Sequence, residues 1–200
     1  MKLLSAVVAA LFLASTAGAE PFELFNHRLY VPATVNGQPV RALLDSGAEM
    51  TVLDDDFARR LDLALEGESE VKGTGGTASA HFASGVALTA AGAPLPNATV
   101  VVIDLEDLTS LAGRPLEVIV GREFFDAGRT RIDFKSGEIV RLAGNGTVAG
   151  ERFPLTTHKG IETFPVSVEG HPPVRADFDL GNGSEVLVGK AYAERIGLAA

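Results

Sequence analysis

Short runs of alternating apolar and polar residues follow one another along most of the chain, and glycine-containing turns separate them. The clearest pair of runs, 28–35 and 40–44, flanks Asn36-Gly37, the dipeptide most typical of a two-residue β-hairpin. Other strands are expected at 81–90, 97–104 and 116–120, and a closing hairpin is expected at 130–142. Short strands at regular spacing with glycine turns predict an all-β fold, either a small barrel or a sandwich.

Helical segments are expected to be few and short. Residues 51–63 begin as a strand and then place Phe57 and Leu61 four positions apart, on one face of a helix. Asp54 or Asp55 is suited to cap the start of this helix. The run from Asp54 to Asp56 also offers three acids to a cation, but the helix dipole favours acids at this end, so we interpret them as part of the helix. The segment 105–114 predicts a helical turn or a loop, and a short helix is expected after Gly121.

The chain contains an internal repeat, because residues 32–63 and 165–198 match in order with only single-residue gaps. The matches include Gly37 with Gly170, Val40-Arg41-Ala42 with Val174-Arg175-Ala176, Asp45 with Asp179, Gly47 with Gly181, and Val52-Leu53 with Val186-Leu187. This ordered set favours duplication over chance. We therefore expect a first lobe at 20–143, a linker at 144–162 and a partial second lobe at 163–200. The second copy lacks the later strands, which indicates either a fragment of a longer protein or a vestigial lobe; we favour the fragment.

The N-terminus has the pattern of a secretory signal peptide. One basic residue, Lys2, precedes an apolar stretch from Leu3 to Leu13, and Ala17-Gly18-Ala19 offers a small-residue cleavage site. The apolar stretch is too short for a spanning helix, so cleavage is favoured over an uncleaved anchor. These features predict a secreted or periplasmic protein with residues 1–19 removed.

Composition limits the classes of partner. The formal net charge of −9 argues against binding to nucleic acid or to anionic membranes. The chain has no cysteine, which leaves no disulfide and no thiolate chemistry. The four histidines are scattered without metal-ligand spacing, so no metal and no cofactor is expected.

Asp45 is the residue that suggests chemistry. It stands at the end of the apolar run 40–44 and is followed at once by Ser46-Gly47-Ala48. Such a sequence can be a simple turn in which the aspartate accepts hydrogen bonds from the backbone. It can also present a carboxylate at a rigid strand end, where glycine permits another chain segment to approach closely.

Three motifs in order distinguish these alternatives. Asp45-Ser46-Gly47-Ala48 is followed by a glycine-rich stretch, 73–76, and then by Ile119-Val120-Gly121-Arg122 ahead of a short helix. This set resembles the retropepsin-like aspartic protease family. The resemblance implies a small closed acid-protease barrel and an aspartic endopeptidase that needs no cofactor. It also implies a catalytic Asp45, support from Ser46, Gly47, Ala48 and Gly121, and a flap over a peptide substrate formed by Gly73, Thr74, Gly75 and Gly76.

The chemistry implied by the family requires a second aspartate. Two carboxylates about 3 Å apart share one proton and so can act together as base and acid. Asp179 is the repeat's counterpart of Asp45, but Leu180 and Asn182 replace the serine and the alanine of the first motif. The partner is therefore either Asp179 of the same chain or Asp45 of a second chain in a homodimer. The alternative to an enzyme is an inactive peptide-binding or interaction module on the same fold.

Overall fold

The computed structural model describes residues 18–73, 76–144 and 149–198. Most of the predicted signal peptide, residues 1–17, lies outside them. The first lobe contains β1 (Glu20–Pro21), β2 (Glu23–Phe25), β3 (Arg28–Val35), β4 (Gln38–Leu44), β5 (Val52–Asp54), α1 (Asp55–Arg60), β6 (Glu66–Gly73), β7 (Gly76–Ala90), β8 (Ala93–Ile103), α2 (Glu106–Ala112), β9 (Val118–Val120), α3 (Glu123–Asp126), β10 (Thr130–Asp133) and β11 (Glu138–Arg141). The predicted all-β class with short helices is confirmed.

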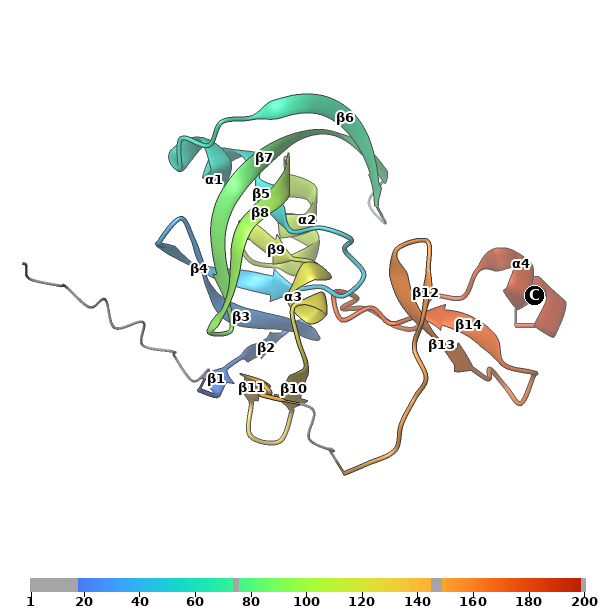
Figure 1. The fold of residues 1–200 in the computed structure, drawn as a ribbon. Helices are drawn as coiled ribbons and strands as arrows, with labels where there is room; N and C mark the ends of the chain where they lie inside the picture. The colour runs from blue at the N-terminus through green and yellow to red at the C-terminus, as the bar shows by residue number, and fades with distance from the viewer. Residues whose placement is uncertain (1–17, 74–75, 145–148, 199–200) are drawn as a thin grey trace, which may run out of the picture.

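The main sheet of the first lobe closes into a ring. Eight strands follow the order β2-β3-β4-β9-β5-β8-β7-β6, and β3 also pairs with β7. A separate three-stranded sheet, β1-β11-β10, lies beside this ring. Figure 1 shows β6 and β7 curving together over the top of the lobe. The interior is filled by aliphatic side chains from the ring strands, including the fully buried Val31, Leu44, Leu53 and Val102.

Local sequence accounts for the hairpin that carries Asp45. Asn36 and Gly37 both have positive φ angles, 49° and 83°, as a type I′ turn requires, and Val35 pairs with Gln38 across it. Closing the turn in this way sets the register of β3 and β4. Ala42 and Leu44 therefore point into the core, and the chain leaves β4 at Asp45.

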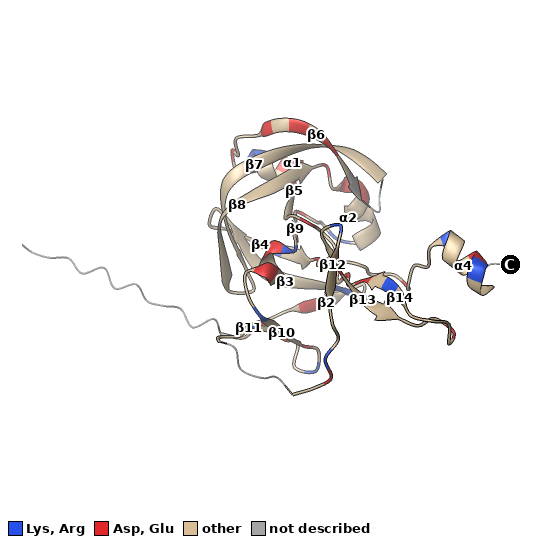
Figure 2. Cartoon of the chain, turned by 45° about the vertical axis from the view of Figure 1, so that its right-hand side comes forward, with Lys and Arg blue, Asp and Glu red and all other residues tan. Residues whose placement is uncertain are grey.

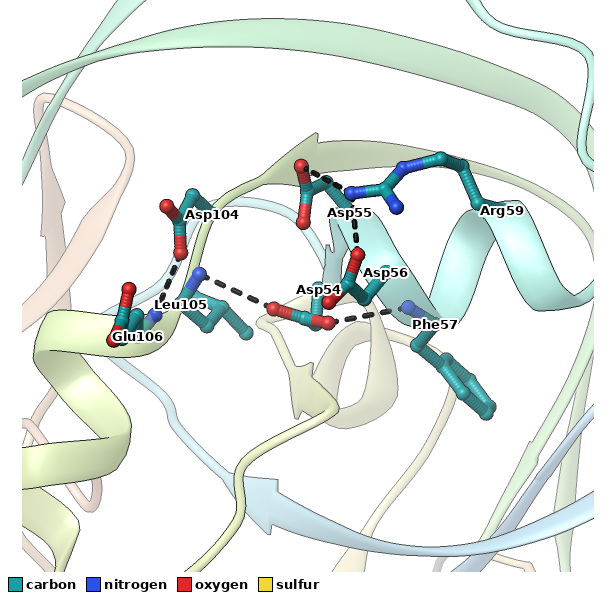
Figure 3. Close-up of polar contacts among 8 residues, drawn as sticks. All are labelled: Asp54, Asp55, Asp56, Phe57, Arg59, Asp104, Leu105 and Glu106. Carbon is teal, nitrogen blue, oxygen red and sulfur yellow. Dashed lines mark hydrogen bonds and ion pairs between the residues drawn. The ribbon is translucent and has the colours of Figure 1, made fainter.

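The three acids at the start of α1 are used within the fold, as Figure 3 shows. Asp54 is the N-cap: its Oδ1 accepts from the Phe57 amide at 3.1 Å, and its Oδ2 accepts from the Leu105 amide at 3.3 Å. Asp55 and Asp56 both form ion pairs with Arg59 one turn later. The capping interpretation of this acidic run is therefore confirmed, with Asp54 as the capping residue.

The later helices follow the sequence expectations closely. The segment left open as a turn or a loop forms α2, which ends at Gly113 in the left-handed conformation (φ 74°). The short helix expected after Gly121 is α3. None of the helices within the described residues is long and apolar enough to cross a membrane.

The second lobe is small and open. It contains a three-stranded sheet of β12 (Thr156–His158), β13 (Ile161–Val166) and β14 (Val174–Asp177), followed by α4 (Lys190–Ile196), beside the first lobe in Figure 1. Its order, β12-β13-β14, repeats β2-β3-β4 of the first lobe. Val186 and Leu187 are 80% and 75% exposed, whereas Leu53, the counterpart of Leu187, is fully buried between β8 and β9. Within residues 149–198, the second copy has the repeated hairpin and helix without the strands that cover this position in the first.

The sheet of the second lobe starts earlier than the predicted boundary at residue 163. β12 lies inside the predicted linker and pairs with β13 through a tight turn at Lys159 and Gly160, both with positive φ. The polar run 156–160 gave no strand signal because only three residues pair and none of them is buried. The proposed division of the chain otherwise stays a prediction.

Replacing Asp54 by alanine should lower the free energy of unfolding by about 1–2 kcal/mol, because the cap of α1 and the bond to Leu105 are both lost. Denaturant unfolding monitored by circular dichroism measures this change. The matched control is Asp56→Ala in the same turn, where only an exposed ion pair is lost and less than about 0.5 kcal/mol is expected. Equal losses in the two variants would contradict the capping role.

Candidate active site

The backbone around Asp45 is held at the end of β4. Leu43 and Leu44 pair in parallel with β9, and the Asp45 amide donates to the Val120 carbonyl at 3.0 Å. The Asp45 carboxylate then turns back onto its own loop, where Oδ1 accepts from the amides of Gly47 at 2.7 Å and Ala48 at 3.2 Å. The side chain is therefore fixed in orientation by the two residues that follow it in the predicted motif.

Gly121 and its neighbours support this loop from behind. The Gly121 amide donates to Thr51 Oγ1 at 3.2 Å, and the Arg122 amide donates to the Ala48 carbonyl at 2.8 Å. A Cβ atom on Gly121 would lie 2.5 Å from the carbonyl carbon of Met50, so no larger residue fits there. This contact gives a physical reason for the glycine in the predicted supporting position.

Asp179 repeats the geometry of Asp45 in the second lobe. Its Oδ1 accepts from the amides of Gly181 at 2.8 Å and Asn182 at 3.2 Å. The backbone amide of Asn182 thus donates the same hydrogen bond as the amide of Ala48 in the first loop. The change from alanine to asparagine therefore does not alter the turn. Asp179 is exposed, whereas Asp45 is partly buried.

The two aspartate loops face each other at close range. A Cβ atom on Gly47 would lie 2.8 Å from Cγ of Asp179, and a Cβ atom on Gly181 would overlap the carboxyl of Asp45. Each carboxyl therefore rests over the glycine of the opposite loop. The sequence predicted that glycine permits a close approach, and the two glycines at the predicted positions make this one.

Ser46 connects the loops by two hydrogen bonds. Its buried hydroxyl donates to the Phe178 carbonyl at 2.7 Å and accepts from the Leu180 amide at 3.0 Å. Leu180 has no hydroxyl to form the reciprocal pair of bonds, but its side chain packs against the core of the first lobe. The second loop is thus held by one hydroxyl and one apolar contact instead of by two hydroxyls.

The proximity of the two carboxyls changes the acidity of Asp45. The pKa of Asp45 is raised from 3.8 to about 6, and burial is the largest cause. The charge of Asp179 and a hydrogen bond with that carboxyl also raise the pKa, whereas the amides of Gly47 and Ala48 lower it. A carboxyl with this pKa holds a proton under mildly acidic conditions next to a second carboxyl. This is the arrangement in which one group donates a proton while the other accepts one.

Comparison with known proteins agrees with these features. Residues 31–124, just under half of the chain, match the profile of a family described as "Aspartyl protease". By this match, the first lobe is an aspartyl protease domain. Among solved structures, the chain is similar to the EIAV protease in complex with the inhibitor HBY-793, with 21% identity, 50% of this chain and 86% of that chain covered, and a TM-score of 0.38. None of the curated proteins matches the chain.

In this aspartyl protease lobe, the hairpin of β6 and β7 occupies the position of the predicted flap. Gly73 and Gly76 are paired at its end, and Thr74 and Gly75 lie outside the described residues. Ala80 is fully buried on one face, and β6 carries exposed glutamates, which Figure 2 shows in red. The hairpin therefore has a small apolar face and an acidic strand.

Sequence reasoning missed two groups of this aspartyl protease lobe that position the loop. The Glu123 carboxylate accepts a hydrogen bond from the Thr51 amide at 2.6 Å. The Arg122 side chain reaches the second lobe, where it donates a hydrogen bond to the Gly160 carbonyl. Arg122 and Glu123 directly follow Gly121 in the sequence, and this position next to a predicted supporting residue was the signal that could have pointed to them. Their partners are 38 or more residues away in sequence and could not be assigned without the fold.

Replacing Asp45 by asparagine should stabilise the protein at pH 7 and leave it nearly unchanged at pH 4. The folded state holds the Asp45 proton more tightly than the unfolded chain, so unfolding becomes easier as pH rises from about 4 to about 6. A rise from 3.8 to about 6 corresponds to at most about 3 kcal/mol, and partial exposure makes the effect smaller. Asparagine keeps an oxygen for the two backbone amides and has no proton to lose.

Denaturant unfolding of both proteins between pH 4 and pH 8 measures this difference. In Asp179→Asn protein the neighbouring charge is absent, so the pH-dependent loss of stability should be smaller and should shift to lower pH. A stability difference between Asp45→Asn and the parent that stays constant over this range would contradict the raised pKa.

Proposed function

We propose that the protein is an aspartic endopeptidase in which Asp45 and Asp179 activate a water molecule between them. The observation that carries this proposal is the placement of the two carboxyls, each over the glycine of the opposite loop. The family match supports a protease-like function for the first lobe. The second aspartate, and with it the two-aspartate mechanism, is our inference from this geometry.

The pair works with one proton between two carboxyls. The ionised carboxylate accepts a proton from the water while the water oxygen attacks the peptide carbonyl carbon. The protonated carboxyl donates its proton to the carbonyl oxygen. Collapse of the resulting diol breaks the C–N bond, while one proton passes to the leaving nitrogen and another returns to the pair. The products are a carboxylic acid and an amine, and the pair recovers its single proton.

The substrate class follows from the surroundings of the pair. The curved β6–β7 hairpin arches over the first lobe (Figure 1), and a peptide held beneath it in extended form can pair with exposed strand backbone. Hairpin closure would exclude water from the reacting bond. We therefore propose a peptide or protein substrate bound between this hairpin and the two aspartate loops.

A second candidate function has a specific observation in its favour. Asp179 is exposed, and the apolar positions Val186 and Leu187 of its lobe are uncovered. A lobe this open can serve as a peptide-binding or interaction module without catalysis. A third arrangement pairs Asp45 with Asp45 of a second chain, in which each Ser46 would meet another serine instead of Leu180.

Asp45→Asn should lower kcat/KM for peptide hydrolysis by about 100-fold or more, because the titrating group is removed while the loop geometry is kept. Activity of the parent should be highest under acidic conditions and should fall above about pH 6, where Asp45 loses its proton. The measurement uses a peptide library with mass spectrometry, and Asp104→Asn, at an exposed aspartate outside the two aspartate loops, serves as the control.

Asp179→Asn separates the three arrangements when it is combined with sedimentation velocity. Lost activity in a folded monomer supports the pair within one chain. Retained activity in a dimer means that the catalytic pair consists of Asp45 from each of two chains. A parent protein that binds peptides but cleaves none under any condition from pH 3 to pH 8 is the binding module.

We also propose that the protein is secreted or periplasmic, on the basis of the signal-like residues 1–19. The expected mature protein begins at Glu20, the first residue of β1, which pairs with Ile139. Sequencing the N-terminus of the exported protein tests this expectation. Retention of residues 1–19 on protein recovered from the expressing cells would contradict it.

A further inference from the structure

The segment that follows the Asp179 loop resembles a strand that has lost its neighbours. Val186 and Leu187 are the repeat's counterparts of Val52 and Leu53 in β5. β5 is hydrogen-bonded on both sides, in parallel to β8 and antiparallel to β9. Residues 186–189 pair with no strand in the described part of the chain, and the side chains of Val186 and Leu187 are exposed. The second lobe therefore presents to solvent what the first lobe covers with two strands.

β14 borders the same open position. In the first lobe a single strand, β9, pairs in parallel with β4 and antiparallel with β5, and so lies between them. β14 is the counterpart of β4, but it pairs with β13 alone and ends its three-stranded sheet. The Asp45 amide donates to Val120 of β9, whereas the Asp179 amide donates to none of the described residues. Both segments that would flank a strand like β9 are thus unpaired on that side in residues 149–198.

The charge at the end of the helix indicates which strand would fit. Arg60 of α1 stacks on Phe57 and forms an ion pair with Glu117, the residue directly before β9. The repeat keeps the first contact: Arg195 of α4 lies 5.0 Å from the ring centroid of Tyr192, compared with 5.2 Å for the first pair. Among the described residues, Arg195 has no ion pair. The arginine is therefore in place for an acid that would arrive with the added strand.

The residue after the strand is also constrained by the repeat. Gly121 follows β9, and a Cβ atom on it would lie 2.5 Å from the carbonyl carbon of Met50. The counterpart of Met50 in the second copy is Ser184. A strand that leaves the second lobe by the same path would meet the Ser184 backbone, so it needs a glycine there as well.

We propose that β14 and residues 186–189 form an acceptor site for an extended segment of another polypeptide, with an acid, three aliphatic residues and a glycine in that order. The segment runs parallel to β14 and antiparallel to residues 186–187, as β9 does in the first lobe. Main-chain hydrogen bonds supply affinity, and the aliphatic side chains cover Leu187. β9 of a second copy is not available, because Val118–Val120 is buried and paired on both sides. The inference does not depend on peptidase activity.

The test adds a fluorescent peptide with the sequence of residues 114–123, RPLEVIVGRE, to the full chain. Fluorescence anisotropy should show saturable binding. The amides of Asp45 and Asp54 donate to β9 and to the residue before it, and their counterparts are the amides of Asp179 and Val188. Hydrogen exchange of these two counterparts should slow by about tenfold or more when the peptide binds. Exchange at Asp45 and Asp54 should not change, which shows that the peptide does not replace β9.

Variants of the protein and of the peptide locate the site. Leu187→Asp should weaken binding by about tenfold or more, because a carboxylate then lies where the aliphatic side chains must pack. The matched control is Leu111→Asp, at a similarly exposed leucine of α2, which should bind as the parent does. Glu117→Lys in the peptide should weaken binding by about two- to fivefold, since an exposed ion pair is lost. Arg195→Glu in the protein should restore binding of this altered peptide.

Equal affinity of Leu187→Asp and the parent would overturn the acceptor site, and so would the absence of saturable binding at about 1 mM peptide. Slower exchange at Asp45 and Asp54 in place of Asp179 and Val188 would assign the binding to the first lobe. A parent that sediments as a dimer with its Val188 amide already protected would show that a second copy covers this face, which also contradicts the proposal. Peptide cleavage is measured separately, so a protein that binds the probe and cleaves nothing refutes only the peptidase proposal.

Discussion

The central constraint on this structure is that two carboxyl groups must approach each other against their mutual repulsion. The approach is possible only where neither loop has a side chain in the space between them, and Gly47 and Gly181 provide this space from opposite sides. The cost is reduced by donors that face each carboxylate: two backbone amides at Asp45 and two at Asp179. In the proposed pair, one proton shared between the groups would remove the remaining repulsion at acidic pH.

The ring of the first lobe makes this approach rigid. β9 lies between β4 and β5, so the strand that delivers Asp45 and the strand that follows its loop are both hydrogen-bonded to one central strand. Gly121, directly after β9, then packs against the carbonyl of Met50 and closes the loop from behind. The second lobe has no such central strand within its described residues. Its aspartate loop is hydrogen-bonded instead to Ser46 of the first lobe, through Phe178 and Leu180.

Much of this arrangement could be predicted from local sequence. Asn36-Gly37 fixes a hairpin because few dipeptides accept positive φ at both positions, and Asp54 caps α1 through a bond to an amide three residues away. The internal repeat identified Asp179 because the two hairpins match residue by residue. These signals all act over a few residues or depend on direct comparison within the chain.

The contacts between lobes could not be predicted in the same way. The bond from Ser46 to Phe178 spans 132 residues, and Arg28 and Gly183 carry no pattern that links them. β12 was missed because its three paired residues look like a polar linker. Such features depend on where the folded lobes meet, which neither periodicity nor turn chemistry encodes.

The two aspartates are alike in their loops and unlike in their surroundings. Backbone donors at nearly equal distances hold both carboxylates, so the duplicated sequence has kept the geometry of the loop. The environment differs, because Asp45 is partly buried against a complete ring whereas Asp179 is exposed on an open sheet. Burial opposes charge, and it is the largest cause of the raised pKa of Asp45. In the proposed pair, burial favours the protonated form of Asp45, which suits the first lobe to donate the proton.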